Sequence, residues 1–302
     1  MRTLSKPKNI DSIKNGIDIS SAVRTLLSFD EPEGISSLRK DEASLMAELI
    51  KYDYEMKQNG YLNHDSVRNF IKHKTALEWI YSRPSKKRKT AFIDAIRQAY
   101  ADEGILCPYC GVSPCRTLDH YYSKALLPQF SFLPENLIPC CGDCNRDKGS
   151  KKAFSKWRRF YNPFYDDYSV FESDEPLLII IFKENPHPNV DMNYIITANH
   201  NLPYLTRKHI NYHINAANIA RGHYESISNS FWRVAQDLIN YRKLLNSRSI
   251  SEQIYDSLLN MHIKRNDNLS YDWEFIIRYS LVKIQVNSWI YRSNSPKLDL
   301  DN

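Results

Sequence analysis

The sequence predicts a mainly α-helical protein with a small β component (α+β), and three observations carry this prediction. Apolar residues recur at helical spacing before residue 107, and further helical stretches are expected toward Tyr291. Short segments suited to strands lie between these helical regions. All six cysteines of the chain fall between Cys107 and Cys144, which indicates one compact cysteine-based site.

The composition predicts a globular protein without a membrane partner. Hydrophobic residues make up 42% of the 302 positions, which is enough to build a core. The longest apolar run, from Leu177 to Phe182, is far too short to cross a bilayer, and the N-terminal segment lacks the apolar block of a secretory signal. We therefore expect a cytoplasmic protein. The formal charge of +6 is too small to indicate a nucleic-acid partner by itself.

Residues 1–106 are expected to form a helical N-terminal region. The segment "DEASLMAELIKYDYEMK" places four apolar side chains on one helical stripe, at Leu45, Leu49, Tyr52 and Met56. The segment "TAFIDAIRQAYADEG", residues 90–104, has a similar stripe and is stopped by Gly104. Such stripes are most simply the core-facing sides of helices.

The cysteines form two matched pairs with metal-ligand spacing. "CPYC" and "CGDC" are C-x2-C knuckles separated by 30 residues, and together they supply four thiolates for a tetrahedral structural Zn²⁺: Cys107, Cys110, Cys141 and Cys144. Cys115 and Cys140 remain outside this set. Replacing Cys141 by Cys140 gives a less regular C-x3-C frame. A four-thiolate site has no open position, so we expect this zinc to be structural.

The segment between the knuckles is expected to be strand, loop and strand, with a helix following. Asp119 and His120 end the first strand, and Asn145 starts a helix that continues through Phe154, Trp157 and Phe160. A histidine of near-neutral pKa suits the activation of water for phosphodiester hydrolysis. Carboxylate and amide oxygens suit a hard divalent cation, so Asp119 and Asn145 are its candidate ligands. Lys148, one turn after Asn145, is expected to reach the phosphate.

Residues 107–150 resemble the ββα-metal core of HNH endonucleases, in the branch with two zinc knuckles. The shared pattern is C-x2-C, a D-H pair, an Asn-Leu in the loop, and C-x2-C-N-x2-K. The resemblance implies that His120 is the general base and that Asp119 and Asn145 bind Mg²⁺ or Mn²⁺. It implies that Asn136 orients the histidine and braces the loop, and that Lys148 is the basic residue after the final Asn. Ser123 stands where a proline is expected.

The remaining chain, 161–302, is expected to be a mostly helical C-terminal region with a small sheet, which binds substrate or a partner. Its strands are predicted at "LLIIIF" and "MNYIITA". A Pro-Phe-Tyr-Asp motif after the zinc-stapled core (107–160) resembles the HNH subunit of Septu-type bacterial defence systems. His209 and His213 have metal-ligand spacing, but no Glu follows His209, so we interpret them as polar residues facing solvent or each other.

The sequence thus predicts a metal-dependent HNH endonuclease, a hydrolase of antiviral defence acting on nucleic acid. DNA is the first-choice substrate, and RNA, including tRNA, is the second, because nothing here reads the 2′-hydroxyl. A non-catalytic zinc-dependent adaptor for nucleic acid or protein is the alternative from another class. A further alternative is a nuclease subunit that is inactive until a partner such as an ATPase activates it. Trp157 can stack on a base, although packing of the helix onto the core is the favoured interpretation.

Overall fold

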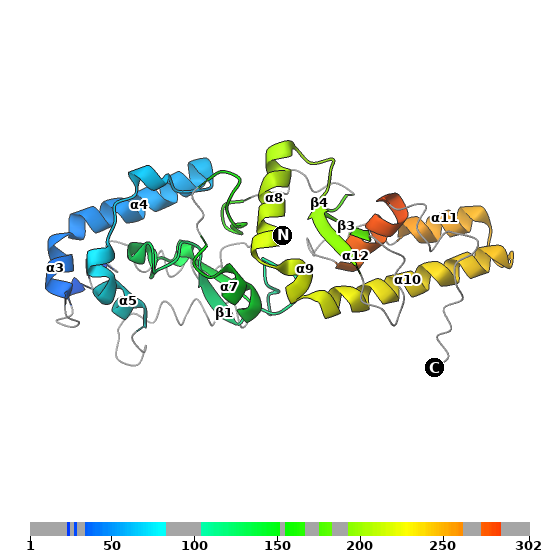
Figure 1. Cartoon of the computed structure of the whole chain (residues 1–302), viewed down its shortest axis with the longest axis horizontal. Helices are drawn as coiled ribbons and strands as arrows, with labels where there is room; N and C mark the ends of the chain where they lie inside the picture. The colour runs from blue at the N-terminus through cyan, green and yellow to red at the C-terminus, as the bar shows by residue number, and fades with distance from the viewer. Residues whose placement is uncertain are drawn as a thin grey trace. The chain divides into compact units, whose positions relative to one another are not determined.

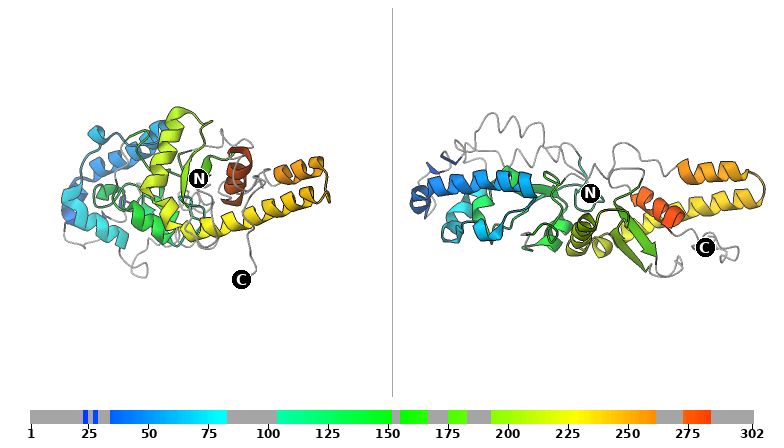
Figure 2. Two further views of the ribbon diagram at one scale, coloured as in Figure 1. Left: turned by 45° about the vertical axis from the view of Figure 1, so that its right-hand side comes forward. Right: turned by 90° about the horizontal axis from the view of Figure 1, so that it is seen from above.

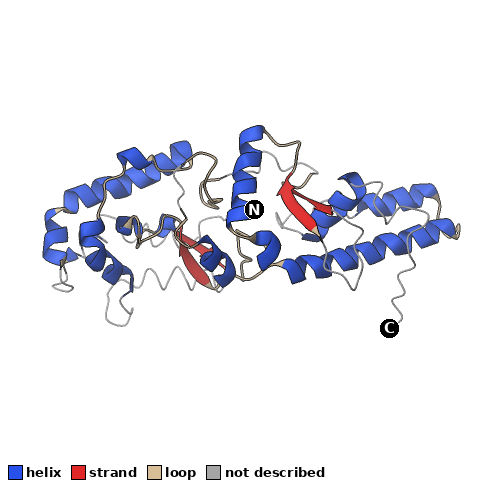
Figure 3. Cartoon of the chain, in the orientation of Figure 1, coloured by secondary structure: helices blue, strands red, loops and turns tan. Residues whose placement is uncertain are grey.

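A computed structural model describes residues 23–24, 27–28, 34–82, 104–151, 155–166, 175–182, 193–261 and 273–284. The described chain is mainly helical with two small antiparallel sheets, which confirms the predicted fold class (Figure 3). It divides into two compact units. The first contains Met1–Tyr168 and Lys208–Asn218, and the second contains Ser169–Arg207 and Ile219–Asn302. The helix expected at 90–104 lies outside the described residues, apart from Gly104.

In the described N-terminal part of the first unit the chain forms α3 (Ile35–Lys40), α4 (Glu42–Asn59) and α5 (Lys74–Ser82) (Figure 1). Single 3₁₀ turns follow α4, at His64–Ser66 and Ile71–His73. The four-residue stripe predicted on α4 is buried as expected. Gly60 ends this helix with a φ of 73°, a left-handed conformation that glycine adopts without steric cost.

Helix α4 supports the loop between the two knuckles. The Tyr52 hydroxyl donates to the backbone carbonyl of Glu135 at 3.2 Å, and its ring lies 4.9 Å from that of Phe130. The loop contains two 3₁₀ turns, Pro128–Phe130 and Pro134–Asn136. The first turn also contacts α5, and the nearby Ser131 hydroxyl donates to the Leu77 carbonyl of that helix. The N-terminal helices therefore hold the loop of the candidate site in place.

The segment from the first to the second knuckle folds in the predicted order of strand, loop, strand and helix. Strands β1 (Thr117–His120) and β2 (Leu137–Cys140) pair antiparallel, with Asp119 opposite Ile138 and His120 opposite Leu137. Helix α7 (Gly142–Lys148) follows β2 and packs on β1.

Helix α7 is shorter than the sequence predicts, so the expectation of a continuous helix to Phe160 is wrong. Gly149 ends it with a φ of 52° and a ψ of −133°, a backbone conformation that residues other than glycine rarely adopt. Trp157 and Phe160 lie in the irregular segment beyond it, and Phe154 lies outside the described residues.

The second unit pairs a small sheet with helices. Strands β3 (Leu178–Phe182) and β4 (Tyr194–Ala198) are antiparallel and match the two predicted strands. The Ile180 amide donates to the Ser280 hydroxyl at 2.8 Å, which ties β3 to the C-terminal helices. The longest helix, α10, runs beside α11 in both views of Figure 2. The helices after β4 are α8 (Tyr204–Ala216), α9 (Ile219–Gly222), α10 (Tyr224–Asn246), α11 (Glu252–Met261), α12 (Trp273–Tyr279) and a π-helical turn, Ser280–Ile284.

Among the described residues, no helix combines the length and the apolar character needed to cross a membrane.

The greater part of α8 belongs to the first unit, because Lys208–Asn218 packs with the zinc-knuckle segment.

Candidate active site and metal centre

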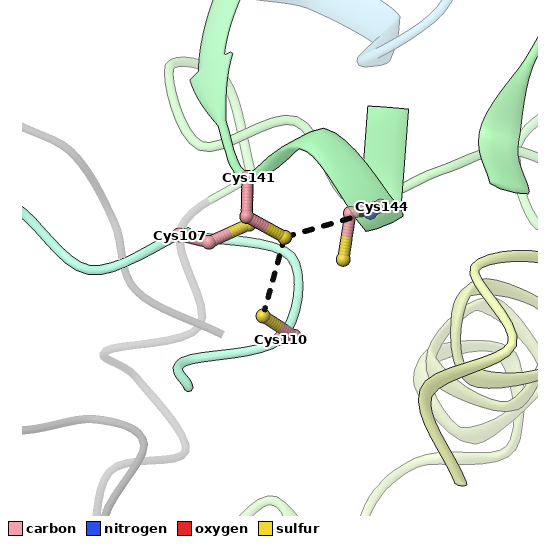
Figure 4. A group of neighbouring side chains, drawn as sticks. All are labelled: Cys107, Cys110, Cys141 and Cys144. Atoms are coloured by element: carbon pink, nitrogen blue, oxygen red, sulfur yellow. Dashed lines mark hydrogen bonds between the residues drawn. The ribbon is translucent and has the colours of Figure 1, made fainter. Parts of the chain in front are cut away.

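Four buried cysteine thiols converge at one point of the first unit (Figure 4). The Sγ atoms of Cys107, Cys110, Cys141 and Cys144 all lie within 4.8 Å of one another. A tetrahedral zinc with bonds of about 2.3 Å needs sulfur separations of about 3.8 Å, and the Cys110 and Cys141 sulfurs are 3.9 Å apart. The cluster therefore fits a metal ion such as zinc.

The backbone at each knuckle is shaped to aim these thiols inward. Gly111 has a φ of 67° and donates its amide to the Cys107 carbonyl at 2.7 Å, which closes the turn after "CPYC". At the other knuckle Cys141 is the N-cap of α7, and its sulfur accepts from the Cys144 amide. Burial raises the pKa of the Cys107 thiol, so four thiolates are stable here only with a cation between them.

The structure settles which cysteines form the cluster. Cys140 is buried at the end of β2, and its sulfur lies 3.5 Å from the Thr117 hydroxyl. Cys115 is also buried outside the group. The regular C-x2-C frame with Cys141 is therefore correct, and the C-x3-C frame is not used.

Asp119 is held in a buried set of charged and polar contacts on the α7 side of β1. Only 3% of the residue is exposed. The Tyr109 hydroxyl donates to its Oδ2 at 2.8 Å, and burial raises the pKa of this tyrosine, which keeps the donor protonated. The Lys148 ammonium lies 3.0 Å from Oδ1 and 2.9 Å from Oδ2.

Lys148 and Asn145 project from α7 toward β1, three residues apart. The Lys148 side chain has no exposure to solvent, and its Nζ also donates to the His120 carbonyl at 2.8 Å. The structure thus gives Lys148 a buried place beside Asp119 instead of the expected phosphate contact. Asn145 donates its Nδ2 to the Thr117 hydroxyl at 3.2 Å. One carboxylate and one amide thus come from neighbouring strand and helix. Their oxygens are of the kind that a hard divalent cation takes, but the Lys148 ammonium lies within hydrogen-bond distance of both oxygens of Asp119.

The His120 ring contacts the loop and Tyr81 of α5, whereas the neighbouring Asp119 contacts Tyr109 and α7. Its Nε2 lies 2.9 Å from the Ser131 carbonyl and therefore carries the proton in the neutral ring, which leaves the lone pair on Nδ1. The Tyr81 ring packs edge-on, with centroids 4.5 Å apart. Burial lowers the pKa of His120 to about 4, against the near-neutral value expected from the sequence. The ring is therefore neutral at physiological pH.

Asn136 braces the loop that carries Ser131. Its Oδ1 accepts from the Tyr122 amide at 2.8 Å, and its Nδ2 donates to the carbonyls of Tyr122 and Phe130 at 3.1 and 3.0 Å. The side chain is fully buried. Because Phe130 precedes Ser131, these bonds fix the carbonyl that the His120 ring contacts. Asn136 acts on the histidine through this loop.

Two histidines of α8 lie beside the candidate site. They were predicted to face solvent or each other, and the first of these alternatives is wrong because both rings are buried. His213 Nδ1 accepts from the Tyr161 amide at 3.2 Å, and its Nε2 lies 3.0 Å from the Tyr109 carbonyl. His209 Nε2 lies 3.2 Å from the Phe160 carbonyl. Both rings are buried. The i, i+4 spacing singled out this pair, but no sequence signal identifies backbone partners so distant along the chain.

Comparisons with known proteins identify no family for this chain. No protein-family model matches it, and no solved structure matches it. The chain is similar to Protein ea31 of Escherichia phage lambda, with 30% identity over 128 residues. This similarity covers 37% of the chain and 42% of the phage protein.

Proposed function

We propose that this chain is an HNH-type endonuclease that hydrolyses phosphodiester bonds, with DNA as the first-choice substrate. One observation carries the proposal. A strand, a loop, a strand and a helix, joined by the four-cysteine cluster, place Asp119 and Asn145 on facing elements and hold His120 with a lone pair on Nδ1. A zinc-binding module without catalytic activity has no need for this combination.

In the proposed reaction, His120 Nδ1 accepts a proton from water as the water oxygen attacks phosphorus. The bond from phosphorus to the 3′ oxygen breaks, the 3′ oxygen takes a proton from solvent water, and the products carry a 3′-hydroxyl and a 5′-phosphate. Asp119 and Asn145 are the residues that would hold Mg²⁺ or Mn²⁺. Such an ion would supply positive charge beside the phosphate and the leaving oxygen. The carbonyl of Ser131 orients the imidazole, and Asn136 keeps that carbonyl in place.

A cleavage assay with matched histidine variants tests this function. Purified wild type, His120→Ala and His200→Ala are incubated with plasmid, linear and single-stranded DNA and with total RNA, in Mg²⁺, in Mn²⁺ and in EDTA. His200 is exposed in the second unit, so it controls for loss of a histidine. We expect His120→Ala to reduce cleavage by about 10²–10⁴-fold and His200→Ala to leave it unchanged. Equal cleavage by all three proteins would exclude the assigned base, and cleavage of RNA alone would make RNA the substrate.

A partner-gated form of the same enzyme predicts a different pattern. If the chain is the nuclease subunit of an anti-phage defence system, wild type alone cuts nothing, and addition of an ATPase partner restores cleavage. Free cleavage by the pure protein at physiological Mg²⁺ would contradict gating.

One observation favours a second function, a non-catalytic zinc-dependent adaptor. Both carboxylate oxygens of Asp119 already have buried hydrogen-bond donors, as a purely structural carboxylate would. An adaptor binds its nucleic acid or protein equally well with His120→Ala and shows no cleavage under any condition. A nuclease loses cleavage in that variant and keeps its fold and its zinc.

A further inference from the structure

We propose that the segment 155–158 is a contact surface for single-stranded nucleic acid, with Trp157 stacking on an unpaired base. The inference rests on the proposed function and names the form of substrate that this unit engages. The Trp157 side chain is among the exposed large hydrophobic groups, with 38% of its residue surface accessible. Lys156 and Arg158, on either side of it, are also exposed. A tryptophan that packed a helix onto the core would be buried.

The segment is fixed close to the candidate active site. Phe160, three residues after Trp157, is fully buried, and its carbonyl accepts from the Tyr121 hydroxyl at 2.8 Å. The Lys148 ammonium lies 5.4 Å from the Phe160 ring centroid, and the same ammonium pairs with Asp119. Three extended residues span about 10 Å at most. A base stacked on Trp157 would therefore lie within a few nucleotides of Asp119 along a bound strand.

The charge around the indole matches a phosphate backbone. No acidic residue occurs between Asp147 and Asp166. Of the basic residues in that stretch, Lys148 and Arg159 are buried in ion pairs with Asp119 and Asp166, whereas Lys151, Lys156 and Arg158 are exposed. The Lys208 ammonium of α8 lies 4.9 Å from the centre of the Trp157 ring and covers one face of it. The indole is thereby oriented, and Lys156 and Arg158 place positive charge on either side of it in the chain, where flanking phosphates would lie.

The preference for single strands follows from the chemistry of stacking. Bases in a duplex are stacked on each other, so an indole on a surface finds a free base face only in a single strand, a frayed end or a loop. Stacking also tolerates any base, because every base has a π-face.

Binding measured on the inactive full-length protein tests the surface. The His120→Ala protein is combined with Trp157→Ala, Trp157→Phe or Lys156→Ala/Arg158→Ala. Fluorescence anisotropy is measured with labelled oligothymidine of about 20 nucleotides, an abasic strand of equal length, and a duplex. Zinc content and melting temperature are recorded for every variant, so a misfolded protein is identified.

We expect Trp157→Ala to weaken binding of oligothymidine by about 5- to 150-fold and Trp157→Phe to retain most of it. The abasic strand should bind all the Trp157 variants equally. The double basic variant should weaken both strands and lower the salt slope by about 1.4. Unchanged oligothymidine binding in Trp157→Ala, or an equal loss on the abasic strand, would overturn the stacking role and leave a protein contact for this surface.

The outcome of this experiment is separate from the outcome for the nuclease. Binding is measured without catalysis, so stacking without cleavage by wild type removes the nuclease proposal and keeps the surface. If cleavage depends on His120 but Trp157→Ala does not change binding, the nuclease proposal is kept and the stacking surface is removed.

Discussion

The hydroxyl of Tyr109 donates a hydrogen bond of 2.8 Å to Oδ2 of Asp119, in a buried setting. Tyr109 stands between Cys107 and Cys110, the two thiols of the first knuckle. The cysteine cluster and the candidate metal-binding carboxylate are therefore one side chain apart. A displacement of the knuckle displaces the donor that orients Asp119, so the cysteine cluster also acts on the geometry of the candidate site.

Removal of this hydroxyl is the first prediction. Tyr109→Phe keeps the ring and leaves Oδ2 with one donor fewer, so we expect the free energy of unfolding to fall by about 1–3 kcal/mol. Zinc should stay bound. Urea denaturation and metal analysis of the same sample measure both quantities. Tyr54→Phe, at an exposed position of α4, is the control and should change neither. A loss of zinc in Tyr109→Phe would mean that the hydroxyl supports the knuckle and not the carboxylate.

The buried pair of Asp119 and Lys148 gives a prediction of coupling. Lys148→Met leaves a buried carboxylate without its cation, which we expect to lower the free energy of unfolding by about 3–5 kcal/mol. Asp119→Asn combined with Lys148→Met should cost clearly less than the sum of the two single variants, because neither charge then lacks a partner. Urea denaturation of the four proteins measures the cycle. Additive losses would show that the two groups do not interact.

Loss of one knuckle thiol should remove the metal. Cys144→Ser leaves three thiolates, and we expect zinc content to fall from about one ion per chain toward zero with a loss of several kcal/mol of stability. Cys115→Ser is the matched control, since Cys115 is buried but outside the cluster. Metal analysis and thermal melting distinguish the two variants. Equal zinc in both proteins would contradict the four-thiol site.

The buried histidines of α8 predict a loss of stability in acid. Burial lowers the pKa of His209 to about 4 and that of His213 to about 3, whereas both lie near 6.5 in the unfolded chain. Below about pH 6.5 these two histidines bind protons in the unfolded chain but stay neutral in the folded chain. The free energy of unfolding therefore falls as the pH drops toward 4. Each group contributes up to about 1.4 kcal/mol per pH unit.

Urea denaturation with excess zinc across this pH range measures the effect. His213→Gln should flatten the slope by close to one proton, whatever its effect on stability at neutral pH. His200→Gln, at an exposed position, should keep the wild-type slope. An unchanged slope in His213→Gln would show that the ring is protonated in the folded protein.

The sequence predicts those parts of the fold that depend on local spacing. The stripe through Leu45, Leu49 and Tyr52 predicts α4 because burial of one helix face follows directly from period. The matched C-x2-C pairs predict which four thiols gather, since two short turns can each aim a pair at one point. The order of strand, loop, strand and helix follows from the apolar segments around Asp119 and His120.

Features set by contacts between distant segments were not predictable in this way. His213 has the spacing of a surface pair, but its partner Tyr109 lies 104 residues away along the chain. Helical spacing predicts which face of α7 carries Lys148. It does not predict that this face packs against Asp119 and buries the lysine. The helical spacing of the apolar residues predicts a helix through Trp157, but the backbone angles of Gly149 end α7 before it.

The first unit is assembled from two separated pieces of chain, Met1–Tyr168 and Lys208–Asn218. On the ribosome, His213 is synthesised 104 residues after Tyr109. At ordinary elongation rates this delay is about 5–20 s. During that interval the first knuckle lacks the contact that His213 of α8 makes with the Tyr109 carbonyl. The first unit can therefore complete its fold only after the ribosome has synthesised Ser169–Arg207 of the second unit.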